Sequence, residues 1–291
     1  MSLELRWRTS LSATCLHAAV CQQQGLPTVD DQLAVAIAPV AAALHTELMM
    51  LGDPRKALLE LCSLSAEYEN NRELAERTVA RLTTGDPTAV SHLEGHITGL
   101  EAALLKVQPE VAEQLAVRGR PLQEQWEARG PGLLRAMGRM TDPAIVPEFA
   151  EVILVSPYVG GHGTAHSRNN RVVYEAVLTN PVAEIPETVR LAWLLAQLNY
   201  DLAAFTDQVS PARLAVVAPL ANLPAALAAG EEVELTTCDT QKIEAALAAW
   251  HLTSDLPAGA ANTLWQWWNT VQNGQQRWPV ALAALEAMLR S

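Results

Sequence analysis

The chain has little of what usually assigns a sequence to an enzyme class. Its 291 residues contain no P-loop, no dinucleotide-binding glycine fingerprint, no nucleophile elbow and no kinase signature. The sequence therefore indicates neither nucleotide-dependent chemistry nor a serine-hydrolase site. No complete catalytic motif of another kind is present, so the residues leave the function undetermined and favour a protein that is not an enzyme.

Charged residues are also few, at 18% of the chain, and acidic residues outnumber basic ones by 32 to 20. The resulting net charge of -12 repels nucleic acid and anionic lipid at long range, and no run of lysines or arginines opposes it. The most apolar stretch, residues 214–230, is interrupted by Pro219, Asn222 and Pro224, which makes it a poor membrane span. We therefore expect no nucleic-acid and no membrane partner; a protein partner or a homo-oligomer stays open.

The cysteines form no CxxC pair and no compact disulfide framework; they are Cys15, Cys21, Cys62 and Cys238. Reduced and mostly buried thiols are the expectation for such a pattern. The amino-terminal segment has Glu4, Arg6 and Arg8 ahead of residues 11–17 and lacks the continuous apolar core of a secretory signal. These features predict a cytoplasmic protein.

Hydrophobic residues make up 49% of the chain, which predicts a fully folded protein. Most of the sequence has helical periodicity, but two apolar runs at residues 152–155 and 171–178 flank a glycine-rich connection and are typical of strands. We predict a predominantly helical α+β fold with a small antiparallel sheet around residues 151–178 packed against helices. A single compact unit over 1–291 is expected; the alternative is a helical layer at 1–140 followed by the sheet and further helices at 141–291.

Prolines and glycines predict where helices begin and break. Asp53-Pro54 and Asp86-Pro87 each pair a capping side chain with a proline at the first helical position. Pro121 is expected to begin a helix that Gly130-Pro131-Gly132 interrupts, and residues 211–230 are expected to form two short helices. Residues 233–237 are a further candidate strand.

His162 and His166 are the first candidates for chemistry. Both lie in the glycine-rich connection, where imidazoles can approach a metal or an anionic ligand without steric obstruction. Glu175 is the nearest acidic residue that could complete such a site, and Tyr174 points to the opposite face of the same strand. No cofactor is expected from this pattern; the alternative is zinc or another divalent metal, bound by His162 and His166 in a metal-dependent hydrolase.

His92 and His96 are the second candidates for metal binding, because residues four apart share one face of a helix. In the zinc-hydrolase pattern HExxH the glutamate follows the first histidine directly, whereas Glu94 lies nearly opposite that face. A solvated or capping pair is therefore the favoured interpretation of His92 and His96.

Residues 189–195, Val-Arg-Leu-Ala-Trp-Leu-Leu, form an apolar helix that follows the strands and a proline-containing turn. The segment resembles the HExxH-bearing helix of zincin metalloproteases in its leucines and alanine. The order of strands, turn and helix is also similar to that in the family. Val189 and Trp193 stand in place of the two zinc-binding histidines, and Arg190 in place of the catalytic glutamate. The resemblance, centred on residues 151–205, implies a zincin-like core over 123–205 that cannot bind zinc or activate water in the manner of that family. An ordinary core helix is the competing interpretation.

Arg190 is informative under both interpretations. It either lies at the helix edge with its stem over apolar surface, or is buried against a carboxylate such as Glu175 or Glu187. The candidate ligand-binding residues are thus His162, His166, Tyr174, Glu175 and Arg190.

The leading functional hypothesis is a binding or structural protein without catalytic activity, on a degenerate zincin-like scaffold, with a cleft between residues 160–170 and the helix that begins at Glu187. A third hypothesis is a helical interaction module that exposes Trp265 or Trp268. Core packing is favoured for these indoles, because the chain has only two phenylalanines to fill large volumes.

Overall fold

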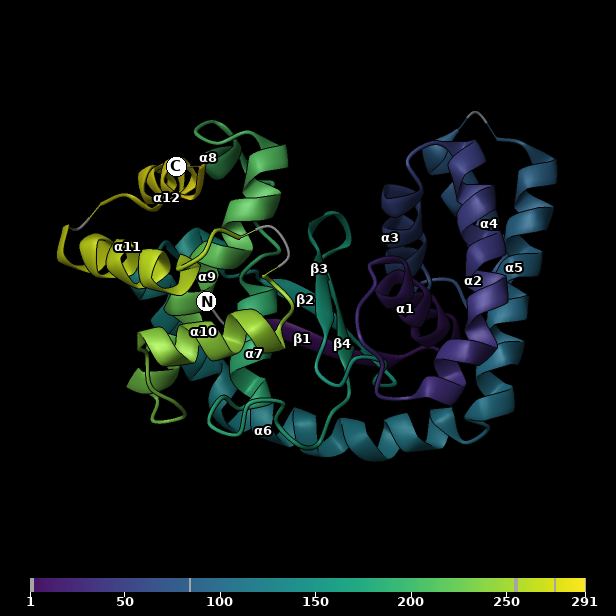
Figure 1. Cartoon of the computed structure of the whole chain (residues 1–291), viewed down its shortest axis with the longest axis horizontal. Helices are drawn as coiled ribbons and strands as arrows, with labels where there is room; N and C mark the ends of the chain where they lie inside the picture. Colours follow the sequence, from purple (N-terminus) through teal and green to yellow (C-terminus); the bar gives the residue numbers. More distant parts are fainter. Residues whose placement is uncertain (1–2, 84, 254–255, 275, 291) are drawn as a thin grey trace.

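A computed structural model describes residues 3–83, 85–253, 256–274 and 276–290 (Figure 1). The chain is 66% helical and holds a small four-stranded mixed sheet. The predicted fold class, a predominantly helical α+β protein, is confirmed. The sheet lies between two groups of helices, one from each half of the chain (Figure 1).

The first half of the chain begins with a strand and continues as a stack of helices. Asp30, Asp53, Asn70 and Asp86 each cap a helix, because their side chains accept hydrogen bonds from backbone N–H groups of its first turn. The predicted cap-and-proline starts at Pro54 and Pro87 are confirmed. The elements are β1 (Glu4–Thr9), α1 (Leu11–Gln23), α2 (Asp31–Leu51), α3 (Pro54–Leu64), α4 (Asn71–Leu82) and α5 (Pro87–Val107).

The second half carries the other strands and a second group of helices, which a long helix along one side of the molecule joins to the first half (Figure 1). This helix is α6 (Val111–Met140), followed by η1 (Pro143–Ile145), β2 (Phe149–Val155), β3 (Gly163–His166), η2 (Ser167–Asn169) and β4 (Arg171–Glu175). The chain then forms α7 (Glu187–Leu195), α8 (Ala203–Thr206), α9 (Pro211–Glu232), α10 (Thr240–Ala249), α11 (Ala260–Gly274) and α12 (Trp278–Arg290).

The sheet has the strand order β1-β2-β4-β3, and it is not the antiparallel sheet that the sequence suggested. β1 and β4 both pair with β2 in parallel, and only β3 runs antiparallel, against β4. The difference arises at the short β3, which lies inside the glycine-rich connection, where the sequence predicts no strand. Because β3 lies between β2 and β4 in the chain, the chain reverses direction twice. β4 therefore runs parallel to β2.

The two faces of the sheet meet different helices. Leu154 and Tyr174 are register partners and share the face covered by α6 and α7, where the Leu154 side chain packs close to Gly119 of α6. Val155 and Glu175 share the opposite face, on the side of α1. A division of the chain at residue 140 would separate β1 from β2, its partner in the sheet.

Two helices are longer than the sequence indicated. α6 continues through Pro121 and Pro131, and α9 through Pro219 and Pro224. Each internal proline removes one helical hydrogen bond, but both helices bury apolar residues along their whole length, and this packing keeps them continuous. Residues 233–237 form no strand; the chain turns there after α9.

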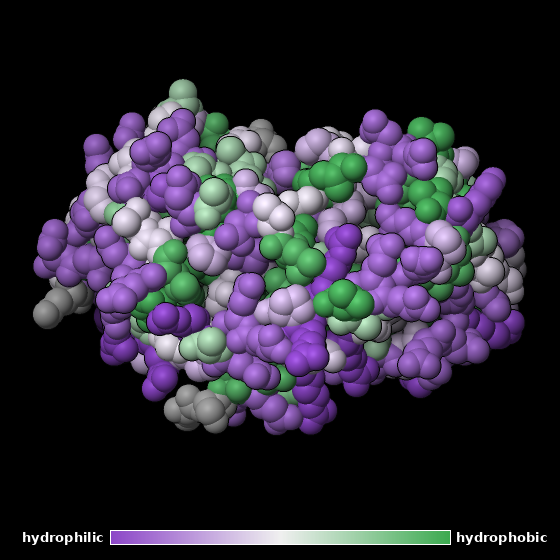
Figure 2. All heavy atoms as spheres, turned by 90° about the horizontal axis from the view of Figure 1, so that it is seen from below, coloured by the Kyte–Doolittle hydropathy of each residue, from purple (hydrophilic) through white to green (hydrophobic). Residues whose placement is uncertain are grey.

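Two helices are long and apolar enough to cross a membrane, judged by length and composition alone. For α9, 67% of its most apolar window is buried, as in a core helix; for α2 the share is 22%. The exposed side of α2 carries Val35, Met49 and Met50. On the side of the molecule where α6 lies, the surface is mostly hydrophilic, with apolar side chains in several separate small areas (Figure 2).

A buried polar network anchors the carboxy-terminal helices. The Trp278 indole N–H donates to the Tyr200 hydroxyl (2.8 Å), which lies 2.7 Å from Asn222 Oδ1. The Asn222 amide in turn donates to the Ala196 carbonyl (3.0 Å), just beyond α7. All three side chains are buried. The network therefore fixes α9 and α12 against the end of α7.

Replacement of Tyr200 by Phe should lower the free energy of unfolding by about 1–3 kcal/mol, because it leaves the Trp278 N–H and the Asn222 Oδ1 buried without their partner. Urea unfolding measures the loss. Tyr68→Phe, the same change at a half-buried position, should stay within about 0.5 kcal/mol of the wild type. Equal losses in the two variants would show that the network is not stabilising.

Candidate functional site

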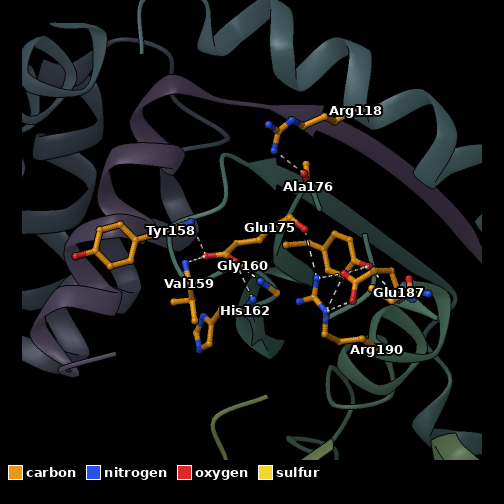
Figure 3. A network of polar contacts seen from close by, with 12 residues as sticks. Arg118, Tyr158, Val159, Gly160, His162, Glu175, Ala176, Glu187 and Arg190 are labelled. Atoms are coloured by element: carbon orange, nitrogen blue, oxygen red, sulfur yellow. Dashed lines mark hydrogen bonds and ion pairs between the residues drawn. The ribbon is translucent and has the colours of Figure 1, made fainter. Parts of the chain in front are cut away.

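The carboxylate of Glu175 is enclosed by the loop that follows β2. Its two oxygens accept hydrogen bonds from the backbone N–H groups of the consecutive residues 158–162, at 2.6–2.9 Å (Figure 3). Gly160 and Gly161 have φ values of +95° and +140°, which turn successive N–H groups toward one acceptor. A Cβ on Gly161 would also lie 2.3 Å from the Pro181 ring. The glycines thus serve to wrap the backbone around Glu175.

His17 of α1 lies against the same carboxylate. Its Nε2 is 3.0 Å from Glu175 Oε1, and both side chains are almost completely buried. Burial disfavours the charged imidazolium, but Cys21 and Glu175 outweigh it and raise the pKa of His17 to about 10. Burial would likewise raise the pKa of Glu175, yet the hydrogen bonds from His17 and the loop hold that pKa well below its usual range. The two groups form a buried ion pair.

His17, Cys21 and His162 come together beside this ion pair. Cys21 Sγ is 3.5 Å from His17 Nε2 and 3.7 Å from His162 Nδ1, and the three potential ligand atoms lie within 4.8 Å of one another. Burial and the neighbouring charge of His17 lower the pKa of His162 to about 3, so its imidazole is neutral. In the described part of the chain, this is the group of three His, Cys, Asp or Glu side chains placed to hold a metal ion.

Sequence reasoning named His162 but missed His17 and Cys21. The cysteine pattern predicts only a buried thiol at Cys21, and no motif includes His17. The available signal was their separation of four residues, which puts both side chains on one face of α1. What brings His162 to that face is the Glu175 loop, and this contact joins residues 141 positions apart in the chain.

Tyr174, Glu187 and Arg190 form a second network on the opposite face of the sheet. Figure 3 shows Glu187 and Arg190 side by side. Arg190 forms a buried ion pair with Glu187, and its guanidinium carbon lies 4.1 Å from the centre of the Tyr174 ring. The Tyr174 hydroxyl reaches Glu187 Oε2 at 3.0 Å, and an Arg190 N–H reaches the Glu175 carbonyl at 3.3 Å. Of the two placements considered for Arg190, the buried one is correct. Tyr174 and Glu175 point to opposite faces, as expected.

The two other residues of the zincin-like helix segment are also in packing positions. The Trp193 indole N–H donates to the Pro219 carbonyl (2.7 Å), and Val189 packs near Gly230. Both contacts are with α9. The helix face that carries Val189, Arg190 and Trp193 is therefore occupied by protein.

His166 lies apart from His162, on the α3 side of β3. It lines an open cleft of about 450 Å³, together with residues 53–63 of α3 and its cap and residues 165–169. Its Nε2 is buried without a hydrogen-bond partner, and burial together with the charge of Arg171 lowers the pKa of His166 to about 4. The structure does not bring His162 and His166 together as the predicted metal site requires. Their even spacing gives them the same face of the sheet, but His162 lies against His17 and Cys21 of α1, whereas His166 lies farther along β3, beside Arg171 and α3.

A second cleft, of about 250 Å³, lies on the other side of β3. Its walls are mostly apolar and come from β3, the end of α7 and α9, with Tyr200, Pro211 and Leu214 among the lining residues. Ala165 and Ser167 line both clefts. The edge strand β3 thus separates two cavities on opposite faces of the sheet.

The remaining candidates lie elsewhere. His92 and His96 lie on α5. His92 is exposed, and its Nδ1 lies 3.2 Å from Glu47 Oε2 of α2 in a surface hydrogen bond. Trp267 and Trp268 are 3% exposed and Trp265 is partly buried, which gives these indoles a packing role.

Comparisons with protein families, with curated proteins and with solved structures find no match to this chain.

Glu175→Gln should destabilise the protein by about 3–5 kcal/mol, because it removes the charge that pairs with buried His17 and sets a side-chain NH₂ against backbone N–H donors. Urea unfolding gives the difference. Glu184→Gln removes an exposed carboxylate that pairs with Lys242 and should change stability by less than about 0.5 kcal/mol. A loss at Glu175 no larger than the loss at Glu184 would contradict the structural role of the loop.

The neutral, half-buried His166 should make stability depend on pH. In the unfolded chain its imidazole binds a proton below about pH 6.5, whereas in the folded protein it does so only near pH 4. The unfolded state therefore binds more protons between these values, and stability falls as the pH is lowered through this window. His166→Asn should reduce the slope, measured by urea unfolding at several pH values. The same substitution at exposed His92 is the control, and an unchanged slope in His166→Asn would contradict the prediction.

Proposed function

We propose that the protein is a non-catalytic binding protein that holds an extended segment of a partner protein along the free edge of β3. The proposal rests on two clefts that lie on opposite faces of the sheet at its edge strand, β3. Ala165 and Ser167 line both clefts. An added strand presents alternate side chains to opposite faces of the sheet, so two such clefts fit its successive residues.

The hydrogen-bonding pattern of β3 supports this mode of binding. The Glu175 N–H donates to the His162 carbonyl, and in an antiparallel pair the bonded residues alternate. Thr164 and His166 therefore direct their backbone groups toward β4, whereas Gly163 and Ala165 direct theirs outward. These outward groups are available to the main chain of a bound segment.

The chemistry of the clefts indicates which side chains they would accept. On the α3 side, Asp53 caps the helix and Glu60 pairs with Arg81. Arg55, Lys56 and Arg168 line the same cleft and form no ion pair within the described residues. An acidic side chain suits this side, and an apolar one suits the cleft at Tyr200 and Leu214. The proposed ligand thus alternates apolar and acidic residues.

The absence of catalysis is part of the proposal. The buried pair of Arg190 and Glu187 supports it, because these groups are committed to each other and to Tyr174. We keep the degenerate zincin-like scaffold as a proposal for the core, supported by the packing of α7 beside β3 and β4.

A cytoplasmic location is likewise proposed. The four cysteines are buried free thiols, as expected of a protein kept in a reducing compartment. With a net charge of -12, we propose a protein partner and neither nucleic acid nor a membrane. The hypothesis of an interaction surface on the tryptophan-bearing helices has no support from the burial of Trp267 and Trp268.

Selection from a displayed random peptide library on the purified full chain tests the proposal. The enriched peptides should alternate apolar and acidic residues. Ala165→Pro removes the outward N–H of β3 and should weaken a selected synthetic peptide by at least about tenfold, the equivalent of about 1.4 kcal/mol. Ala165→Ser keeps the N–H and should bind as the wild type does.

The charge preference is tested with the same peptide. Lys56→Glu should weaken binding of the acidic peptide and leave a version with glutamine in place of its acidic residue unaffected. Selected peptides that bind equally to the wild type and to Ala165→Pro, or that show no alternation, would refute strand addition at β3.

A further inference from the structure

We propose that His17, Cys21 and His162 form a binding site for a zinc-like divalent ion. This site is separate from the edge of β3 and does not depend on the proposed peptide binding. One thiolate and two imidazoles are the ligand types that zinc takes in proteins, whereas magnesium and calcium take oxygen ligands.

The two sulfur–nitrogen spacings match those of a tetrahedral zinc site. With Zn–S bonds of about 2.3 Å and Zn–N bonds of about 2.0–2.1 Å, sulfur and nitrogen ligands lie about 3.6 Å apart at a tetrahedral angle. The two S···N distances are 3.5 Å to His17 Nε2 and 3.7 Å to His162 Nδ1. The imidazole rings of the two histidines have their centres 5.5 Å apart, and the three ligand atoms all lie within 4.8 Å of one another.

The ligands are held in place by the fold. α1 fixes His17 and Cys21 on one face, one helical turn apart. The loop around Glu175 fixes the backbone of His162, whose own N–H donates to Glu175 Oε2 at 2.9 Å. Two elements therefore present the three ligands. To bind the ion, His17 Nε2 exchanges its hydrogen bond to Glu175 for a bond to the metal.

The charges at the site suit a buried divalent ion. Binding exchanges protons for the ion: the Cys21 thiol and His17 Nε2 release theirs to solvent. The thiolate and the Glu175 carboxylate, 3.0 Å from His17 Nε2, then supply two negative charges beside the ion. The sum is neutral, so the ion does not bring an uncompensated charge into the interior.

The His162 side of the site is the side nearer to solvent. This residue is half-buried, unlike His17 and Cys21, and the ring of half-buried His251 lies 6.3 Å from its own. Three protein ligands leave the fourth position of a zinc site to a water molecule. His251 lies beside His162 and is not needed as a ligand.

Cobalt substitution tests the site directly. Untagged full-length protein, stripped with a chelator and kept reduced, is titrated with Co²⁺ and then with Zn²⁺ in competition with a chromophoric chelator. One equivalent should bind. Bound Co²⁺ should show an intense thiolate-to-cobalt charge-transfer band in the near ultraviolet, which Zn²⁺ abolishes on displacement.

Matched variants identify the ligands. Cys21→Ser should remove the charge-transfer band, and both it and His162→Gln should lower zinc affinity by at least about a hundredfold, since outer-shell changes alone cost about 10- to 100-fold. Cys62→Ser and His166→Gln alter another buried thiol and the other loop histidine and should bind as the wild type does. Circular dichroism checks that each variant is folded; His162→Gln changes a half-buried loop residue and keeps the test valid if Cys21→Ser does not fold.

Two results would overturn the proposal. One is the absence of stoichiometric zinc binding at micromolar protein concentration. The other is a charge-transfer band that persists in Cys21→Ser or disappears in Cys62→Ser, which would assign the ion to a different thiol. Neither result bears on the peptide selection, because that experiment is done in the presence of chelator.

Discussion

The structure around both candidate sites depends on one carboxylate in a shell of backbone N–H groups. Glu175 ends β4 and is completely buried, and an ionised carboxylate there requires strong compensation. Five consecutive N–H groups and His17 supply it. In meeting this requirement the loop after β2 folds back on the sheet, sets the start of β3 and brings His162 to α1. The need to compensate the buried charge of Glu175 thus positions both β3 and His162.

Alternation along β4 gives the two faces of the sheet different chemistry. Tyr174 belongs to a network with Glu187 and Arg190, in which every charge is already paired. Glu175 belongs to the face of α1, where a thiol and two imidazoles lie close together. The helix that resembles a zincin active-site helix is therefore on the paired face, and the group suited to a metal ion is on the other. Any metal chemistry of this protein would use residues that the zincin pattern does not contain.

The helices were the most predictable part of the fold, because caps and apolar periodicity are local. The starts at Pro54 and Pro87 follow from Asp53 and Asp86, whose side chains satisfy N–H groups two or three residues on. The failures also have a common cause. Prolines predicted breaks in α6 and α9, yet burial along each helix outweighs the lost hydrogen bonds. The strand direction was misjudged because the four residues of β3 carry little pattern of their own.

Of the site, the sequence by itself determined that Tyr174 and Glu175 face opposite ways and that His17 and Cys21 share a helical face. Both follow from the periods of strand and helix. For Arg190 the sequence left two placements open, at the helix edge or buried against a carboxylate. Only the tertiary structure decided that His162 joins His17 and Cys21 while His166 turns to α3. That choice depends on contacts between segments more than a hundred residues apart, and the glycine-rich loop takes its course from the carboxylate it encloses.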